Sequence, residues 1–407
     1  EDHPMTLLDA VVVGLGAHGS AAAYHLARRG ASVVGIDKGP HAGHSNGSSH
    51  GRSRIIRLAY FEHPSYVPLL ERSFELWEEL AAASEEEEPL LTMTGGLMMG
   101  KPDSEVITGT LASCVEHSLE HEVLDSAEIR SRFPALTPAE DEIGILEARA
   151  GHLVPEACVR EHCRQATMAG ASLRFNTSVA SWEPTPEGTV RVFTDEGEKL
   201  EARKLVLSPG PWAPDLFGRD VAQRIGLTVE RRVLFWFSPS ESANDGGDPL
   251  EPFLELPIYI WDLGSDDEAG GEPVHFYGFQ HQPGSPGGVK VAIHSSQPGD
   301  ACTPATIRRH VDEPEVERMR ELLRGRVPGL AEGKLLDAVS CFYTNTPDGH
   351  FRIAPHPEHP QVILASPCSG HGFKMSSVVG EIIADMTGCC GETDRPPHNV
   401  QLFGISS

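Results

Sequence analysis

Two short apolar runs frame the most informative stretch of the chain, close to its start. Ala10 to Val13 form the first run, and a glycine-rich turn follows it. Small and apolar residues then continue with helical character from Ala21 to Arg29 and stop at Gly30. The second run, Val33 to Ile36, ends on the carboxylate of Asp37. This pattern predicts a strand, a turn, a helix and a second strand, the order of elements that opens a nucleotide-binding α/β domain.

The turn between the first strand and the helix carries three glycines. Gly14, Gly16 and Gly19 give the motif G-x-G-x-x-G. The first glycine permits a tight turn, the second lets the backbone approach a pyrophosphate, and the third lets helix and strand pack closely. The helix N-terminus attracts the phosphates, and Asp37, beside Lys38, can accept hydrogen bonds from a ribose hydroxyl. These five residues predict a dinucleotide site that is compatible with either FAD or NAD.

Helices and short strands alternate through the first half of the chain. Apolar residues at helical spacing predict helices over Ser65 to Ala83, one or two within Ser104 to Arg132, and Pro155 to Gly170. Extended patterns predict strands over Gly95 to Gly100, Ser172 to Phe175, Thr189 to Phe193, Lys199 to Ala202 and Lys204 to Leu207. The return of short apolar strands with glycine ends indicates that the later pieces rejoin the first sheet. The nucleotide-binding domain is therefore expected to be discontinuous.

The second half of the chain changes to an alternating pattern. Loops rich in Asp, Gly and Pro separate the predicted strands Val233 to Phe237, Ile258 to Trp261, Val274 to Phe279 and Val289 to His294. This arrangement predicts an antiparallel sheet in a second domain. The pattern closes with a helix over Glu313 to Leu323, strands over Ala338 to Tyr343 and Val362 to Ala365, and a helix from about Lys374 to Met386.

Composition limits the classes of binding partner and the cellular compartment that we expect for this chain. With 407 residues, 39% of them apolar, the chain is long enough for two domains with separate cores. Its formal charge of -26 argues against nucleic acid or an anionic membrane as a partner. No apolar run approaches the ~20 residues that a membrane-spanning helix needs, and Glu1 to Met5 do not resemble a signal peptide. We expect a cytoplasmic protein.

The eight cysteines follow neither a disulfide framework nor the spacing of a zinc site. Cys389 and Cys390 are adjacent, which is poor geometry for either. We therefore predict reduced, mostly buried thiols and no metal site.

A second glycine turn lies near the end of the chain. Within Pro360 to Met386, a buried strand is predicted to turn through Ser369-Gly-His-Gly372 into a helix that starts near Phe373 or Lys374. Glycines let the backbone pack against a flat ring, and a helix N-terminus carries about half a positive charge. An isoalloxazine with its pyrimidine edge at this position would be stabilised as the anion that forms on reduction. The turn favours a flavin, and a plain strand-to-helix connection is the alternative.

Four segments together carry a resemblance to a known family. They are GLGAHG from Gly14, GSSHGRSRIIRLAY from Gly47 to Tyr60, SCFYTNTPDGHF from Ser340 to Phe351, and SGHGFK from Ser369 to Lys374. In this order they closely resemble the monomeric sarcosine oxidase family, which also includes N-methyltryptophan oxidase and pipecolate oxidase. The resemblance spans almost the whole chain, and the last three motifs are more specific than the first. It implies FAD held covalently through a cysteine thioether to a flavin ring methyl, and Cys341 occupies the matching position.

The resemblance also implies roles for individual residues. Arg57 and Lys374 would bind the substrate carboxylate. His50 and Arg54 would lie around the flavin, and Lys290 would be the cation that aids electron transfer to dioxygen. The other implied positions are Tyr277, His294 and Tyr343 in the substrate pocket, and Gly370, Gly372, Phe373 and Lys374 against the flavin.

Several of these assignments have physical support in the residues themselves. An arginine fork and a lysine ammonium can clamp a carboxylate. On a strand, Cys341 shares a face with Tyr343, and nearby arginines would favour its thiolate. Arg54 and Arg57 would share one face if their segment were helical. Taken alone, the same residues are also compatible with a packing thiol, a solvated lysine and surface ion pairs.

The chain departs from the family pattern beside its functional motifs. Arg52 and Leu58 stand where the family has an aspartate and a histidine, and Pro367-Cys368 replace a glycine and an aromatic residue. Tyr277 lies thirteen positions before Lys290, farther than expected. These differences leave the identity of the amine open.

We therefore expect an α/β (overall α+β) flavoprotein with two domains. A Rossmann-like FAD-binding domain of the glutathione-reductase/D-amino-acid-oxidase type would comprise residues 6–88, 151–222 and 328–392. An antiparallel-sheet substrate domain would comprise residues 89–150 and 223–327, and residues 393–407 would form a C-terminal tail.

The expected reaction is oxidation of the C–N bond of a small secondary amino acid, such as sarcosine or another N-methyl or cyclic amino acid. The product would be an imine, dioxygen would be reduced to hydrogen peroxide, and the enzyme would act as a monomer. The alternatives are an amine dehydrogenase that passes electrons to a carrier protein, an FAD-binding module without amine chemistry, and a nicotinamide-dependent dehydrogenase.

Overall fold

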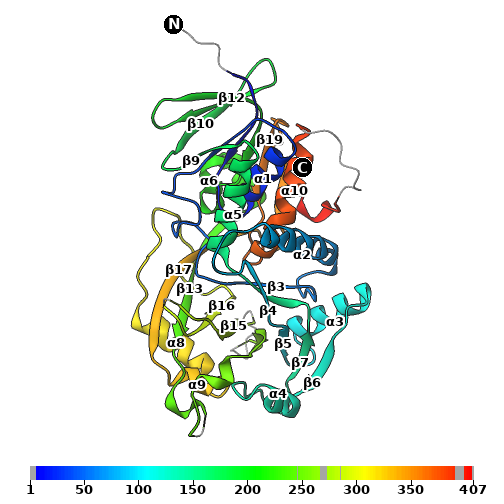
Figure 1. Ribbon diagram of the computed structural model, residues 1–407, viewed down its shortest axis with the longest axis vertical. Coiled ribbons are helices and arrows are strands. Elements are labelled where there is room, and N and C mark those ends of the chain that lie inside the picture. The colour runs from blue at the N-terminus through cyan, green and yellow to red at the C-terminus, as the bar shows by residue number, and fades with distance from the viewer. Residues whose placement is uncertain (1–5, 245, 266–272, 285, 390–397, 406–407) are drawn as a thin grey trace.

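The computed structural model describes residues 6–244, 246–265, 273–284, 286–389 and 398–405 (Figure 1). The expectations for Glu1 to Met5, for Cys390 and for residues 393–397 and 406–407 of the tail fall outside these ranges. Figure 1 shows one large sheet toward each end of the long axis, with the first strands and the last helix at the same end.

The first sheet unites segments that are far apart in the sequence. Within the described ranges it has eight strands, in the order β10-β11-β12-β1-β2-β9, with β19 beside β12 and β18 beside β19. They are β1 (Leu8–Val13), β2 (Val33–Ile36), β9 (Ser172–Arg174), β10 (Val179–Pro184), β11 (Val190–Thr194), β12 (Lys199–Leu207), β18 (Arg352–Pro355) and β19 (Val362–Ser366). β1 runs parallel to both β2 and β12, and β12 runs parallel to β19. The later segments thus rejoin the first sheet, as predicted.

Three details of this sheet differ from the predictions, and one of them is β18, which the sequence pattern missed. The two strands predicted between Lys199 and Leu207 are one, because exposed Arg203 continues the extended backbone between them. Its first half pairs with β11 and its second half with β19. The sequence pattern also missed β10, which is largely exposed and therefore lacks a buried apolar face.

Helices cover both faces of the first sheet. α1 (Ala17–Arg28), α2 (Val67–Ala82), α5 (Pro155–Met168) and α10 (Ser376–Thr387) share one apolar core with strands of the sheet. α6 (Ala213–Leu216) and α7 (Arg219–Ile225) contribute to the core on the other face. Among the described residues, no helix combines the length and apolar character needed to cross a membrane.

The second sheet has the order β17-β13-β16-β15-β14-β5-β7-β6. Its strands are β17 (Leu335–Asn345), β13 (Thr228–Phe237), β16 (Val289–Ile293), β15 (His275–His281), β14 (Ile258–Asp262), β5 (Gly96–Gly100), β7 (Ile143–Glu147) and β6 (Glu122–Asp125). α3 (Glu105–His117), α4 (Ser126–Arg132), α8 (Glu313–Leu323) and α9 (Pro328–Ala331) accompany it.

The second sheet corrects three expectations. It is not wholly antiparallel, because β14 and β5 are parallel. β17, whose segment was grouped with the FAD-binding residues, pairs with β13 in this sheet instead. One or two helices were expected within Ser104 to Arg132, and the structure has two, α3 and α4, with the unpredicted strand β6 between them. Only Leu124 of β6 is buried, so this strand lacks an alternating apolar pattern. The proposed domain boundaries themselves remain a prediction.

A small sheet lies between the two large ones (Figure 1). It contains β3 (Arg54–Arg57), β4 (Leu91–Met93) and β8 (Ala150–Leu153). Arg54 and Arg57 were expected to share one face if their segment were helical, but the segment is a strand. Ile55 and Ile56 are β-branched residues that favour a strand, and three positions apart on a strand means opposite faces.

Gly380 marks the closest packing between α10 and α1. A Cβ at this position would lie 2.5–2.8 Å from atoms of Ala21. We expect Gly380→Ala to lower the free energy of unfolding by about 1–3 kcal/mol, because the added methyl group overpacks the contact. The higher helix propensity of alanine offsets a small part of this loss. Urea unfolding followed by circular dichroism measures the change. Gly404→Ala, where a Cβ meets open space, is the matched control, and equal stability of the two variants would contradict this packing.

Candidate active site

The first glycine turn is closely packed around its backbone. Gly14 has a φ of +88° and a Cβ there would lie 2.3 Å from the carbonyl oxygen of Ser208. A Cβ on Gly19 would lie 1.8 Å from the carbonyl oxygen of Gly14. Both positions therefore require glycine, since any side chain would force strand and helix apart.

Asp37 holds this turn in place. Its carboxylate accepts hydrogen bonds from the amides of Leu15 (2.7 Å) and Gly39 (2.6 Å) and lies 3.1 Å from Nε2 of His44. Burial raises the pKa of Asp37, but the bonds from His44 and the backbone outweigh it and lower the pKa overall. The site therefore presents a carboxylate at the end of β2, where the motif places the ribose.

The second glycine turn lies against the first. Gly370 has a φ of +77°, and a Cβ on Gly372 would lie 1.7 Å from the carbonyl oxygen of Pro367. Nε2 of His18, in the first turn of α1, lies 3.3 Å from the carbonyl oxygen of Gly372. A short 3-10 helix over Phe373–Met375 then leads into α10. The two predicted turns thus form one continuous structure.

A cavity of about 460 Å³ joins the two turns and reaches the second sheet. The predicted site residues that line it are Gly14, Gly16, Asp37, Lys38, Arg54, Arg57, Tyr277, His294, Tyr343, Gly370, Gly372, Phe373 and Lys374. Four predicted residues do not line it: Gly19, His50, Lys290 and Cys341. This lining fits a flavin dinucleotide. Glycines expose the backbone at both turns, Asp37 supplies a carboxylate, and the cations Arg54, Arg57 and Lys374 line the cavity as well.

Cys341 lies just behind the cavity wall, on β17. Its Sγ is 3.5 Å from both Nη2 of Arg54 and the carbonyl oxygen of Ser48. Burial raises the pKa of this thiol, but His50 and Arg54 outweigh burial and bring the pKa down to about 6. A thiolate is therefore the main form of Cys341 at neutral pH. The other buried cysteines among the described residues, Cys114, Cys158 and Cys163, differ, because burial raises their pKa values.

Lys290 is fully buried on β16. Its Nζ donates to the carbonyl oxygens of Gly51 and Ser53, each at 2.7 Å, and lies 5.0 Å from the ring centre of Phe279. Burial, with the charge of Arg54, pushes the pKa of Lys290 well below its usual value. The second sheet thereby holds the loop that carries His50 and leads into β3, which begins at Arg54.

A cationic pair occupies another part of the cavity lining. Arg57 donates to the carbonyl oxygen of Ala59 and to Oε2 of Glu62, both at 2.6 Å, with its guanidinium 4.3 Å from the ring centre of Tyr60. Nζ of Lys374 donates to the carbonyl oxygen of His371 at 2.8 Å.

The charges of this pair depend on one carboxylate. Burial raises the pKa of Glu62, but Arg57, His371 and Lys374 lower it to about 2. Burial lowers the pKa of Lys374 to about 7, with Glu62 opposing and Arg57 adding to the shift. With both cations protonated, two positive charges face one internal carboxylate, so the pair can accept an anion.

His294 and Tyr343 form the neighbouring wall. Nδ1 of His294 lies 3.3 Å from Oη of Tyr343. Burial lowers the pKa of His294 to about 3 and raises the pKa values of Tyr277 and Tyr343. All three side chains are therefore neutral at physiological pH. No group of His, Cys, Asp and Glu among the described residues is arranged to hold a metal ion.

Sequence reasoning missed some residues of the site. Glu62 lies only five positions after Arg57, and this closeness in sequence to the arginine motif could have identified it. Glu147, whose Oε2 accepts from the amides of Leu58 and Ala59 at 3.2 and 3.0 Å, comes from β7 and had no such signal. Burial raises the pKa of Glu147 to about 7.

Two glycine turns around a cavity that ends at buried cations define a flavoprotein oxidoreductase site. Residues 9–386 match the model of the FAD dependent oxidoreductase family, and the chain belongs to that family, among relatives of monomeric sarcosine oxidase. It is 45% identical to monomeric sarcosine oxidase of Streptomyces avermitilis over 97% of this chain and 96% of the relative. It is 31% identical to N-methyl-L-tryptophan oxidase of Citrobacter koseri over 97% and 99%.

A solved structure supports the fold. NikD, described as an unusual amino acid oxidase essential for nikkomycin biosynthesis, superposes with a TM-score of 0.77 over 98% of each chain at 23% identity. The predicted fold class, the family resemblance and the dependence on FAD are thus confirmed, and a nicotinamide-dependent dehydrogenase is excluded.

The pKa of Lys374 predicts how anion binding depends on pH. A small carboxylate such as acetate binds the ammonium form, so its affinity should fall at least about tenfold as Lys374 loses its proton between pH 6 and pH 9. Titration of acetate against the flavin absorbance of the holoenzyme measures this affinity. Lys374→Arg keeps its charge and should bind acetate nearly independently of pH. A flat profile in the wild type would contradict the lowered pKa.

Proposed function

We propose that this chain oxidises a small secondary amino acid, such as sarcosine or another N-methyl or cyclic amino acid. The observation that carries the proposal is the buried pair of Arg57 and Lys374 in the cavity lining, beside the neutral wall of His294 and Tyr343. The relatives named sarcosine oxidase and N-methyl-L-tryptophan oxidase support the same substrate class.

The cationic pair orients the substrate. A substrate carboxylate that bridges Arg57 and Lys374 either joins Glu62 or displaces it from Arg57. A fixed carboxylate leaves the substrate nitrogen and its neighbouring carbon little freedom, and such positioning supplies several kcal/mol of barrier reduction. The wall formed by His294 and Tyr343 is neutral, so this wall places no positive charge against the amine.

The reaction removes two hydrogens across the C–N bond. FAD, held by Gly14, Gly16 and Asp37 at one turn and by Gly370 and Gly372 at the other, would supply the acceptor for the hydride equivalent from the carbon next to nitrogen. It would also allow the two-electron reduction of dioxygen to hydrogen peroxide. Water then hydrolyses the imine, and sarcosine would give glycine and formaldehyde. If the substrate binds as the neutral amine, the protein needs no strong general base, and the low pKa of His294 agrees with this.

We also propose a monomeric, cytoplasmic enzyme, in keeping with the names of the relatives and the net charge of -26.

Substrate oxidation tests the function directly. Sarcosine, other N-methyl amino acids and pipecolate are each added to the holoenzyme without oxygen, and then with it. At least one should bleach the flavin and then give one peroxide per amine consumed. Arg57→Gln should raise KM about tenfold or more, because a buried charge-assisted bond is lost. The proposal fails if none of these amines bleaches the flavin.

Cys341 is the proposed site of covalent flavin attachment. Its pKa of about 6 provides the thiolate that attachment needs, and Arg54 beside it also lines the cavity. After acid precipitation the yellow colour should stay with the wild-type protein and move to the supernatant for Cys341→Ala. Cys158→Ala, a buried thiol without a cationic neighbour that lowers its pKa, is the control. Colour retained by Cys341→Ala would refute this linkage.

Lys290 is the proposed cation for dioxygen reduction. Negative charge that develops on dioxygen would favour the protonated form of a buried amine. Lys290→Met should therefore slow turnover with dioxygen by about tenfold or more, and turnover with an artificial electron acceptor much less. Equal effects on both acceptors would remove this role and favour a dehydrogenase.

A further inference from the structure

An arginine lies directly behind the wall formed by His294 and Tyr343. Arg232, on β13, has a side chain that is only 4% exposed. Its Nε donates to the carbonyl oxygen of His294 at 3.2 Å, and its guanidinium carbon lies 4.8 Å from the ring centre of Tyr343. One side chain thus contacts both residues of the wall, although it does not itself line the cavity.

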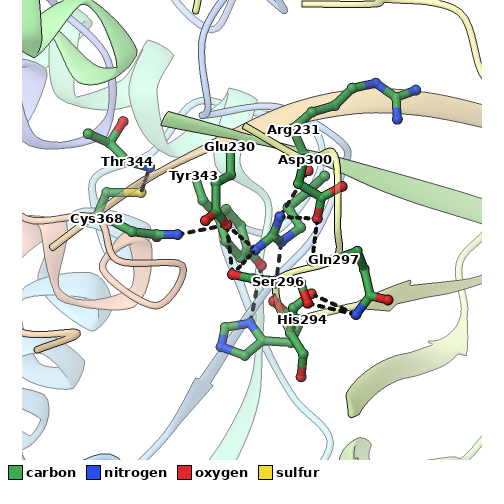
Figure 2. Close-up of polar contacts among 12 residues, drawn as sticks. Glu230, Arg231, His294, Ser296, Gln297, Asp300, Tyr343, Thr344 and Cys368 are labelled. Atoms are coloured by element: carbon green, nitrogen blue, oxygen red, sulfur yellow. Dashed lines mark hydrogen bonds and ion pairs between the residues drawn. The ribbon is translucent and has the colours of Figure 1, made fainter. Parts of the chain in front are cut away.

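The guanidinium is fixed by a nearly complete set of acceptors. Nη2 donates to Oε2 of Glu230 at 2.5 Å and to Oγ of Ser296 at 3.0 Å. Nη1 donates to Oδ2 of Asp300 at 2.7 Å and to the carbonyl oxygen of Arg231. Figure 2 shows Glu230, Ser296 and Asp300 gathered beside His294, with Tyr343 behind them. A planar fork held at this many points has little freedom to shift.

The two carboxylates are fixed in turn. Glu230 accepts further hydrogen bonds from Ser296 (2.8 Å) and Asn345 (3.0 Å). Asp300 accepts from the amide of Gln297 at 2.8 Å. Glu230 and Asp300 therefore absorb the charge of Arg232 within the network, which keeps this cation from competing with Arg57 and Lys374 for an anionic ligand.

The second glycine turn also packs against the wall. A Cβ on Gly370 would lie 2.7 Å from the ring of Tyr343 and 2.9 Å from the ring of His294. The two rings therefore fill the space between this turn and the Arg232 network. Both rings also line the cavity, so loss of the contacts with Arg232 would leave them free to shift into it.

We propose that Arg232 is a positioning residue for substrate recognition, which sets the separation between the wall of His294 and Tyr343 and the cationic pair of Arg57 and Lys374. The inference rests on the proposed substrate pocket and adds a residue that has no contact with the substrate. Its role is to fix where the amine end of a substrate lies once the carboxylate is bound.

The adjacent Arg231 provides a matched control. It is 7% exposed, and it donates to the carbonyl oxygens of Arg308 (2.6 Å) and His310 (2.9 Å) and to Glu315. On a strand it points to the opposite face from Arg232. Loss of either arginine removes a similar buried network, but only Arg232 contacts the pocket wall.

The experiment compares Arg232→Gln and Arg231→Gln as holoenzymes. Each is measured for melting temperature, kcat and KM with the best amine substrate, and the dissociation constant of acetate from flavin absorbance. Both variants should melt at a lower temperature. Arg232→Gln should raise KM about tenfold with a smaller change in kcat and should leave the acetate constant within about twofold, because acetate contacts only the cationic pair. Arg231→Gln should leave all three binding and kinetic constants near wild type.

Arg232→Lys separates geometry from charge and carries the test if Arg232→Gln does not fold. A lysine keeps the positive charge between Glu230 and Asp300 but cannot cover Tyr343 while donating to His294. It should recover stability and retain the raised KM. A wild-type KM in Arg232→Lys would overturn the proposal, as would equal KM values for the two glutamine variants.

Arg57→Gln distinguishes this result from a failure of the proposed pocket. If Arg57→Gln raises KM and weakens acetate binding while the Arg232 variants match Arg231→Gln, only the positioning role is wrong. If Arg57→Gln changes neither constant, the proposed pocket itself is wrong, and the Arg232 proposal is refuted together with it.

Discussion

Burial of positive charge is the constraint on which this site depends. The chain carries a net charge of -26, yet its cavity is lined or flanked by three buried cations, Arg57, Lys290 and Lys374, and by the partly buried Arg54. Removing a charge from water costs several kcal/mol unless the protein provides partners. Here most partners are backbone carbonyl oxygens and aromatic faces, which carry only partial charge. They offset the cost of burial only in part, so the pKa values of Lys290 and Lys374 are lowered. An anionic ligand, or negative charge that develops during reaction, would favour the protonated form of both lysines.

The fold supplies these partners by holding the loop before β3 between the second sheet and helix α5. Lys290 on β16 binds the carbonyl oxygens of Gly51 and Ser53, whereas Glu156 on α5 accepts from the amides of Gly51 and Arg52 at 2.6 and 3.2 Å. The second sheet and a helix of the first thus grip the same segment. Arg52, which stands where the resemblance led us to expect an aspartate, has a φ of +65° and donates to the carbonyl oxygen of Pro283 at 2.8 Å. This replacement therefore reaches a loop of the second half of the chain rather than the cavity.

The sequence predicted those features whose signal is local. The glycines of both turns, the carboxylate after β2, and the helices over Pro155–Met168 and Glu313–Leu323 follow from spacing and turn chemistry, and the structure contains them. The family motifs then pointed to Arg57, Lys374 and Cys341, and the resemblance as a whole pointed to Lys290; no periodicity would single out these residues. The features that the sequence did not predict depend on contacts between segments far apart in the chain. β17 joins the second sheet because β13 offers it a long antiparallel partner, and Arg232 matters only because β16 and β17 place His294 and Tyr343 beside it.

The order of strands in the first sheet has a consequence for synthesis of the protein. β1, with the first glycine turn, is parallel to β12, and β12 is parallel to β19, which leads into the second turn and α10. Nε2 of His18 can contact the carbonyl oxygen of Gly372 only after residue 372 has been synthesised. A ribosome-bound chain that ends before β19 therefore has only half of the cofactor cradle, however well its earlier helices have formed. Contacts between such distant segments close late and slowly, so capture of the coenzyme must follow emergence of the last helix and cannot guide the early steps of folding.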